Sequence, residues 1–416
     1  MGAHHLWLPY PLVVPGKEKP YRVYRGGRVK GPVKPLGSLD LEPPPPAARG
    51  DARPPLAPGY PEYPGPTGPP QAPPRRRGRR VAFWTALILF LAVLVVVGWG
   101  LAGYFSFRSG VKEANRRLPA AAEAALSPQD GSLLSSPSTI LLLGADAGPA
   151  SEGDTGRSDS IVLVRADPDH HRIALLSIPR DLRVEIPGYG VDKINAAYAY
   201  GGPSLTIRTV EDVTGLEINH VVVVDFPSFA ELIDALDGVT IDVPKRIVSN
   251  RFDCPYGTKA RCERWPGWQF EPGRQTMDGK HALIYSRIRE NRLDPSETDV
   301  ARGARQQQVV QAIADEVVSL PGFVRLPFIG DDVTTPLATD LSASELLKLG
   351  WVKFRASDES TLRCRLGGVA EEIDGVWYLA GTEENVSVIG MVTGETAPQP
   401  PPPSQGPYAP GCQVGR

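Results

Sequence analysis

The longest hydrophobic run covers residues 81–103, 23 residues without a charged side chain. At ~1.5 Å rise per residue, a helix of this length crosses the ~30 Å hydrocarbon core of a bilayer. Five arginines within residues 75–80 precede the run, and Arg108 and Lys112 follow it. The positive-inside rule therefore predicts a single-pass anchor with a cytoplasmic N-terminus and an extracellular remainder. The alternative is a cleaved signal peptide, which fits less well because the run starts some 80 residues into the chain.

Shorter strand-like and helix-like patterns alternate after residue 137. Runs rich in Val, Ile and Leu predict buried strands at 139–143, 160–164, 173–178, 220–225 and 239–243. Apolar residues at three- and four-residue spacing predict helices at 194–200, 203–213, 227–236, 278–289, 299–320 and 342–353. The Asp237-Gly238 pair predicts a turn between a helix and a strand. Interleaved strands and helices predict an α/β fold, a three-layer α/β/α sandwich with a mixed central sheet.

Proline content limits how much of the 416-residue chain can fold. Proline occupies 14 of the 32 positions in residues 43–74, which predicts a semi-rigid spacer, and residues 398–410 have the same character. The predicted organisation comprises, in order, a basic, Pro-rich cytoplasmic arm (1–80), a signal-anchor helix (81–103), an extracellular linker (104–136), one folded domain with a C-terminal extension (137–396) and a Pro-rich tail (397–416).

Charge is divided unevenly along the chain. Residues 1–80 carry a net charge of +9, and the remainder carries −11. A basic arm next to anionic lipid indicates a segment held near the membrane surface, and we expect no nucleic-acid partner.

All four cysteines, Cys254, Cys262, Cys364 and Cys412, follow the predicted anchor. An even number of cysteines in an oxidising compartment indicates disulfides, with three possible connectivities. The closely spaced pair Cys254–Cys262 is favoured, which leaves Cys364 for Cys412. The absence of CxxC spacing disfavours a zinc site.

Two carboxylates lie where predicted strands end and begin. Asp146 closes one strand and Asp159 opens the next, so the two side chains meet at one edge of the sheet if the strands are neighbours. Such a pair suits Mg²⁺, which takes one or two carboxylates and fills its other positions with water and phosphate oxygens. Taken singly, each aspartate is better explained as a turn cap.

Several arginines accompany these two acids at strand and helix ends. Guanidinium groups bind phosphate oxygens in a bidentate manner, so several arginines at these ends indicate a diphosphate pocket. Any one of these arginines, taken alone, is explained as well by a surface ion pair. Arg302 and Gln306 are four residues apart on a predicted helix and share a face. The other members of the group are Arg157, Arg180, Arg287, Arg289 and Arg305.

The order of short motifs resembles the LytR-CpsA-Psr family over residues 139–314. The matching motifs are Leu-Leu-Leu-Gly-Ala-Asp (141–146), Arg-Ser-Asp-Ser (157–160), Ser-Ile-Pro-Arg-Asp (177–181), Lys-Ile-Asn-Ala-Ala-Tyr (193–198), Ala-Leu-Ile-Tyr-Ser-Arg-Ile-Arg (282–289) and Asp-x-x-Arg-x-x-Arg-Gln (299–306). The sequence departs from the family at Ser160, where threonine is common, and at Asp237, where glycine is usual.

The resemblance implies a Mg²⁺-dependent phosphotransferase of the cell membrane. Such an enzyme moves a glycopolymer from a polyprenyl-pyrophosphate carrier to peptidoglycan through a phosphodiester bond. By the same resemblance, Asp146 and Asp159 correspond to the metal ligands. The positions that correspond to pyrophosphate-binding residues are Arg157, Arg180, Arg287, Arg302 and Gln306, together with Lys193 and Arg289, whose motif roles are less defined. Catalytic roles are expected for Arg157, Asp159, Arg180 and Asp181.

Three expectations depend on tertiary structure. Asp181 is a candidate general base, with pairing to Arg183 or capping of a turn as the alternative. Because the lipid tail of the carrier needs an apolar environment, we expect an apolar tunnel lined by residues such as Phe226, Phe229, Leu232, Ile233 and Leu236. The same residues would also be found in an ordinary hydrophobic core. A polyprenyl-pyrophosphate hydrolase and a non-catalytic membrane regulator are the alternative functions.

Overall fold

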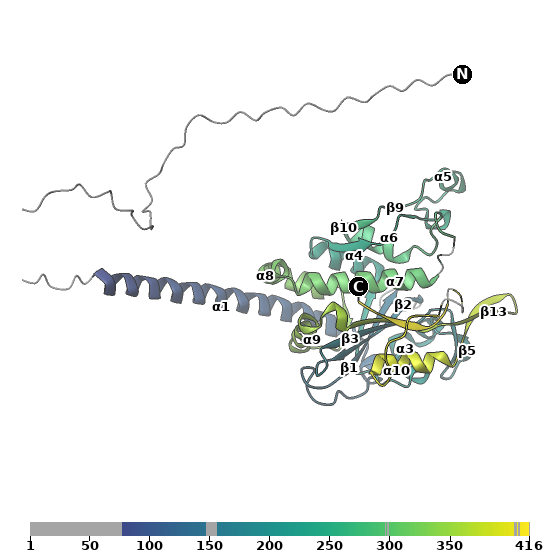
Figure 1. The fold of residues 1–416 in the computed structure, drawn as a ribbon, viewed down its shortest axis with the longest axis horizontal. Coiled ribbons are helices and arrows are strands. Elements are labelled where there is room, and N and C mark those ends of the chain that lie inside the picture. The colour runs from purple at the N-terminus through teal and green to yellow at the C-terminus, as the bar shows by residue number, and fades with distance from the viewer. Residues whose placement is uncertain are drawn as a thin grey trace, which may run out of the picture. The chain divides into compact units, whose positions relative to one another are not determined.

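A long helix, α1 (Arg77–Arg117), begins the part of the chain that this computed structural model describes, residues 77–146, 156–295, 297, 299–402, 406 and 408–415. It contains the predicted anchor, and among the described residues it is the one helix long and apolar enough to cross a membrane. The helix continues without a break past residue 103, so the first part of the predicted linker is helical (Figure 1). The basic arm predicted at 1–80 lies outside the described residues up to position 76.

The central sheet has seven strands in the order β11-β6-β1-β2-β3-β12-β15. Neighbouring pairs are antiparallel in β1–β2 and β2–β3 and parallel in β1–β6 and β3–β12, so the sheet is mixed as predicted. The strands are β1 (Ser138–Ala145), β2 (Ser158–Asp167), β3 (Arg172–Ser177), β6 (His220–Asp225), β11 (Ala338–Thr339), β12 (Thr361–Arg365) and β15 (Gly411–Val414).

Helices cover both faces of this sheet, which confirms the three-layer arrangement (Figure 1). One layer contains α3 (Ala196–Thr214) and α10 (Glu384–Thr393). The other contains α4 (Phe226–Ala235), α6 (Gly279–Arg287), α7 (Asp299–Val317), α8 (Leu320–Thr334) and α9 (Ala343–Arg355). Alternation along β1 explains the two layers: Leu141 and Leu143 belong to the larger core, whereas Leu142 packs toward α9.

Smaller elements surround the sandwich. A second sheet has the order β13-β14-β4-β5, and β7 and β8 form two-stranded ribbons with β10 and β9. Predicted strand 239–243 is therefore correct as a strand but lies outside the central sheet. The bounds are β4 (Leu182–Ile186), β5 (Gly190–Lys193), β7 (Val239–Val243), β8 (Ile247–Val248), β9 (Gln269–Phe270), β10 (Gly273–Met277), β13 (Gly368–Ile373), β14 (Val376–Gly381), α2 (Ala120–Glu123) and α5 (Lys259–Glu263).

Two predicted helices, 194–200 and 203–213, are one element with a kink. Gly202 has φ 60°, a conformation that glycine adopts at little cost, and Pro203 follows it. The predicted turn at 237–238 is confirmed, since Asp237 and Gly238 both have positive φ. Helix α8 and every element after α9 were not predicted, because they lie where the sequence patterns are short or interrupted by proline.

Both disulfides have the favoured connectivity, Cys254–Cys262 and Cys364–Cys412. The second bridge joins β12 to β15, which pair in an antiparallel manner. Part of the segment predicted as a Pro-rich tail is therefore the edge strand of the central sheet, so the folded domain extends past residue 396.

Removing the Cys254–Cys262 bridge should destabilise the protein modestly. The bridge spans eight residues, and chain-entropy reasoning gives about 2.5 kcal/mol for so short a loop. We expect a Cys254→Ser/Cys262→Ser variant to unfold at a lower urea concentration with a similar m-value. Equal urea midpoints for the variant and the oxidised wild type would contradict this expectation.

Candidate active site

The two predicted metal acids lie at the same edge of the central sheet. Strands β1 and β2 are antiparallel neighbours, with Ala145 opposite Ser158. Asp146 directly follows β1 and Asp159 is the second residue of β2, so both lie at the same end of this strand pair. Burial raises the pKa of Asp146, and the Asp159 charge raises it further. Mutual repulsion of two carboxylates is the expected signature of a pair that suits a cation.

Arginines from a distant part of the chain reach the same edge. The charges of Arg287, Arg180 and Arg289 oppose the rise in the Asp146 pKa, so all three act on this carboxyl group electrostatically. Arg287 ends α6, and its guanidinium carbon lies 4.1 Å from the centre of the Phe226 ring. This stacking fixes the planar group in one orientation and leaves its N–H edges available for hydrogen bonds.

Arg180 connects the acids of this edge to each other. Its Nη1 atom lies 2.5 Å from an Asp159 carboxylate oxygen, and its Nε atom lies 3.4 Å from Asp181. Asp181 also accepts a 2.8 Å hydrogen bond from Lys193 Nζ. Burial alone would raise the pKa of Asp181, but the Lys193 hydrogen bond and the Arg180 charge outweigh it and hold the pKa below its ordinary value.

Asp181 is thus a member of an ion-pair network, and its lowered pKa makes it a weaker base than an ordinary carboxylate. The alternative pairing with Arg183 is wrong, since Arg183 Nε lies 3.8 Å from Glu371. Lys193 also lies over the Tyr378 ring, at 5.7 Å from its centre. Lys193 therefore positions Asp181, and through it Arg180.

A cavity of about 980 Å³ begins at this edge and continues between the sheet and the helices of one layer. The residues at its polar end are Asp159, Arg287, Arg289, Arg302 and Gln306. Asp159 belongs to β2, Arg287 ends α6 and Arg289 follows that helix, and the other two belong to α7. The arrangement confirms that these predicted residues converge, although β2 and α7 are separated by more than a hundred residues.

The rest of this cavity is largely apolar. Phe226, Phe229 and Leu232 line it as predicted, with aliphatic residues of β1, β6, α6 and α7. Ile233 and Leu236 do not line it, because they are buried in the neighbouring core cluster. A volume of this size with one charged end suits an amphiphile with an anionic head and an apolar tail.

Arg157 lies outside the cavity lining. Its side chain is exposed. The hydrogen bond from the Tyr200 hydroxyl to Asp192 raises the pKa of Tyr200, and the charge of Arg157 offsets only part of this rise. Neither Arg157 nor Lys193 lines either of the two cavities described for this structure.

Asp253 is a cavity residue that the sequence analysis missed. It lies beside the Cys254–Cys262 loop and lines the cavity. Burial raises its pKa, and the charges of Arg289 and Arg287 partly offset the rise. Its position next to a predicted disulfide was the one available signal, since nothing in its spacing relates it to the arginines.

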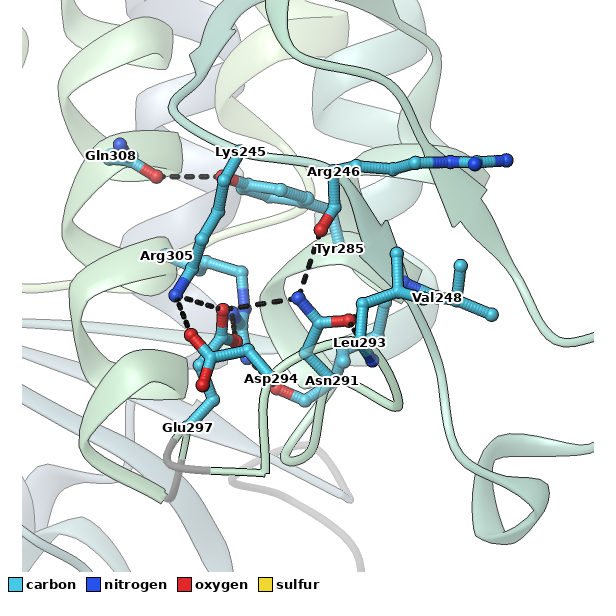
Figure 2. A network of polar contacts seen from close by, with 11 residues as sticks. Lys245, Arg246, Val248, Tyr285, Asn291, Leu293, Asp294, Glu297, Arg305 and Gln308 are labelled. Atoms are coloured by element: carbon cyan, nitrogen blue, oxygen red, sulfur yellow. Dashed lines mark hydrogen bonds and ion pairs between the residues drawn. The ribbon is translucent and has the colours of Figure 1, made fainter.

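Arg305 has a structural role. Its exposed fraction is 5%, and its Nη1 atom donates a 2.8 Å hydrogen bond to Glu297. Nη2 donates to the carbonyl of Ile288, which lies between Arg287, the last residue of α6, and Arg289. Lys245 and Asn291 also contact Glu297, as Figure 2 shows. This network holds the segment after α6 in the position that directs Arg287 and Arg289 into the cavity.

The Glu297 network should make stability depend on acid pH. Burial alone would raise the pKa of Glu297, but hydrogen bonds from Lys245 and Arg305 outweigh it and lower the pKa. Because the folded-state pKa is depressed, this contribution is complete above the unfolded value of about 4.3 and is lost as pH falls through the folded value. We expect the stability difference between wild type and Glu297→Gln, measured by urea unfolding, to narrow between pH 7 and pH 3. A constant difference would contradict the assignment.

Comparison with known proteins agrees with this geometry. The model of the LytR_cpsA_psr family matches residues 103–391. A polyisoprenyl-teichoic acid–peptidoglycan teichoic acid transferase, TagT of Bacillus subtilis, is 30% identical over 321 residues, covering 76% of this chain and 95% of that protein. TagU of Oceanobacillus iheyensis is 33% identical over 267 residues, covering 62% and 76%.

Solved structures with the same fold include two relatives. B. subtilis TagV has a TM-score of 0.53 at 27% identity and covers 64% of this chain and 99% of that one. TagT bound to LIIa-WTA has a TM-score of 0.51 at 29% identity and covers 64% and 93%. The matched region contains both acids, the arginines and the cavity, and the chain therefore belongs to the LytR-CpsA-Psr family.

Proposed function

We propose that this protein is a phosphotransferase that attaches a glycopolymer, carried on a polyprenyl pyrophosphate, to peptidoglycan through a phosphodiester bond. The observation that carries the proposal is the amphiphilic cavity, whose arginine-rich end opens at the acidic edge of the sheet and whose remaining walls are apolar. The names of the relatives specify teichoic acid as their cargo; for this chain the proposal is a glycopolymer of the same carrier-linked type.

The reaction exchanges one phosphoester bond for another. A hydroxyl oxygen of the acceptor attacks the phosphorus that bears the glycan, and the bond from that phosphorus to the bridging oxygen breaks. Polyprenyl phosphate leaves, and the proton of the hydroxyl passes to solvent or to a carboxylate of the site. Arg287, Arg289 and Arg302 bind the head group and neutralise the charge that develops on the departing phosphate.

Asp146 and Asp159 fit a bound Mg²⁺. Their carboxylates lie at adjacent strand ends, and burial together with the charge of Asp159 raises the pKa of Asp146. A hard cation that accepts carboxylate and phosphate oxygens would relieve the repulsion between the two acids. When bound, such an ion supplies positive charge to the pyrophosphate oxygens. Arg180 positions Asp159 through their ion pair.

The proposed location is the outer face of the cell membrane. Helix α1 is apolar and long enough to span a bilayer, and the arginines before it favour a cytoplasmic N-terminus. Two disulfides in the remainder suit an oxidising compartment. This orientation would place the cavity on the side where the lipid-linked donor and the wall meet.

A direct assay separates the three functional classes. Purified full-length protein is incubated with a lipid-linked oligosaccharide, peptidoglycan and Mg²⁺, and wall-bound and free products are quantified by mass spectrometry. A phosphodiester-linked glycan on peptidoglycan is the expected product. Free phosphorylated glycan without the wall-bound product would instead identify a hydrolase, and no turnover in cells or in vitro would favour a regulator.

A further inference from the structure

Arg363 and Arg365 form a pair of cationic side chains that the proposed reaction does not use. They are two residues apart on β12, so they extend from the same face of the strand, while Leu362 and Cys364 between and beside them belong to the core. Both arginines line a second cavity of about 340 Å³, together with Arg180 at the end of β3.

This second cavity adjoins the first. The two share Asp159, Arg302 and Gln306 as lining residues. A molecule whose pyrophosphate occupies the arginine-rich end of the first cavity can therefore extend a neighbouring group into the second.

Neither arginine on β12 has a carboxylate partner among the residues that the structure describes. Arg365 Nε donates a 2.7 Å hydrogen bond to the Ala409 carbonyl. The Nε atom of Arg363 is buried and has no hydrogen-bond partner within the described residues. Burial lowers the pKa of both guanidinium groups, and no acidic charge offsets this effect. A half-buried positive charge without a counterion is unfavourable, which makes an external anion the natural partner.

The backbone that presents the two arginines is held firmly. Strand β12 lies between β3 and β15, and Cys364 is bonded to Cys412 on β15. Gln307 of α7 donates a 2.8 Å hydrogen bond to the Cys364 carbonyl. The backbone of Arg363 and Arg365 is thus fixed relative to α7, the helix that contains the cavity residue Arg302. Binding of an anion therefore costs little backbone conformational entropy.

We propose that Arg363 and Arg365 form a second oxyanion subsite, which binds a phosphate or carboxylate group of a substrate at a point separate from the carrier pyrophosphate. The inference rests on the proposed function and extends it. Guanidinium groups bind both kinds of oxyanion in a bidentate manner. The anion comes either from the glycopolymer of the donor or from the peptide of the acceptor.

The test is a kinetic comparison of Arg363→Gln/Arg365→Gln with wild type. Donors carry either a neutral glycan or one with an additional phosphate, and acceptors carry either free or amidated peptide carboxylates. We expect kcat/KM to fall about 10- to 100-fold for the substrate that supplies the anion, mainly through KM, and to change little for its uncharged counterpart. Arg274→Gln, at an exposed arginine on β10, is the matched control. Equal losses for all substrate pairs, or no loss, would overturn the subsite.

A binding measurement separates failure of the subsite from failure of the proposed reaction. Inorganic phosphate is titrated calorimetrically into the full-length protein in detergent. Wild type should bind one more phosphate than Arg363→Gln/Arg365→Gln, whether or not the protein is an active transferase. The same stoichiometry and affinity for both proteins would overturn the proposal.

Helix α8 lies beside α1, and the two helices keep the same residue offset along their contact. Trp99 Nε1 donates a 3.0 Å hydrogen bond to the Val324 carbonyl, and Ser106 Oγ donates one of 3.0 Å to Asp331. The two residues of each pair are 225 positions apart in the sequence, so the helices are parallel and residue n of α1 lies level with residue n + 225 of α8. Leu320 therefore lies at the level of Val95, about 12 Å before the end of the apolar run at residue 103.

One exposed face of α8 at this level is apolar, while Arg325 on another face pairs with Asp237. Leu320, Val324 and Phe328 are 76%, 51% and 68% exposed and are spaced four residues apart, which places them on one face of the helix. The Phe328 ring also contacts Trp99, with 5.2 Å between ring centres. This face continues the exposed apolar surface of α1 at the same depth.

We infer that the first two turns of α8 are embedded in the outer half of the bilayer beside α1. If α1 spans the membrane, the register leaves residues 320–328 at the level of lipid chains. Burial of three large apolar side chains there is favourable.

Photolabelling of the full-length protein in nanodiscs tests this inference without an activity assay. The nanodiscs contain a phospholipid with a diazirine in its acyl chain, and labelled residues are mapped by mass spectrometry. We expect labels on α1 and on α8 at residues 320–328, and none at Val386, which is 73% exposed on α10. Labels on α1 without α8, or α8 crosslinked to a second copy of the chain, would overturn it.

Discussion

Arg180→Ala should lower the rate of glycopolymer transfer about 10²- to 10³-fold. The guanidinium of Arg180 lines the second cavity and pairs with Asp181 and with Asp159, which lines both cavities beside the proposed site of the transferred phosphate. Loss of one preorganised charged donor at such a point typically has an effect of this size. Arg180→Lys retains the charge but loses the bidentate geometry, so its rate should fall between those of wild type and Arg180→Ala. The rate of formation of wall-bound glycan is the measurement.

Arg183→Ala is the matched control for that experiment. Arg183 lies three residues along the same segment and makes a long, solvent-exposed contact with Glu371, so its removal should leave the rate unchanged. Circular dichroism should show that both variants are folded. Comparable rates for Arg180→Ala and Arg183→Ala would remove Arg180 from the catalytic machinery.

Arg305→Ala should destabilise the fold by about 3–5 kcal/mol. The ion pair between Arg305 and Glu297 is almost completely buried, with 6% exposure of each side chain. Removal of one partner leaves the other charge buried without its main counterion, which is far more costly than loss of a surface pair. The Ile288 carbonyl also loses its donor. Urea unfolding of the full-length protein in detergent is the measurement.

Arg246→Ala provides the contrast for this prediction. Arg246 contacts Glu271, and both side chains are at least half exposed, so the expected change is within about 0.5 kcal/mol. Activity adds a second readout, since a displaced segment after α6 would also move Arg287 and Arg289. Similar unfolding midpoints for Arg305→Ala and Arg246→Ala would show that the buried network does not stabilise the fold.

Local sequence patterns predicted the elements that form the inner sheet. Strands β1, β2, β3 and β6 have continuous apolar runs, and the helices α4, α6, α7 and α9 have clear helical spacing. Elements with short or interrupted patterns were missed. Helix α8 contains Pro327, and β15 lies in a Pro-rich segment whose pairing with β12 depends on a partner almost fifty residues away.

The roles of the site residues were likewise predicted only in part. Convergence of Asp159, Arg287, Arg302 and Gln306 was predicted, because their motifs match a family in which they belong to one site. The roles of Arg305 and Lys193 were not predicted. Each is a basic residue in a motif, and its local sequence is the same whether it contacts a ligand or a carboxylate of the fold.

The sequence by itself predicted an apolar helix long enough to anchor the chain in a membrane, the α/β pattern, the favoured disulfides and the meeting of Asp146 with Asp159, because each depends on composition or on residues close together in the chain. The tertiary structure decided which arginines line the cavity, which stabilise the fold, that β12 presents Arg363 and Arg365 beside the site, and that α8 runs in register with α1. These outcomes depend on contacts between residues tens to hundreds of positions apart, for which local periodicity contains no signal.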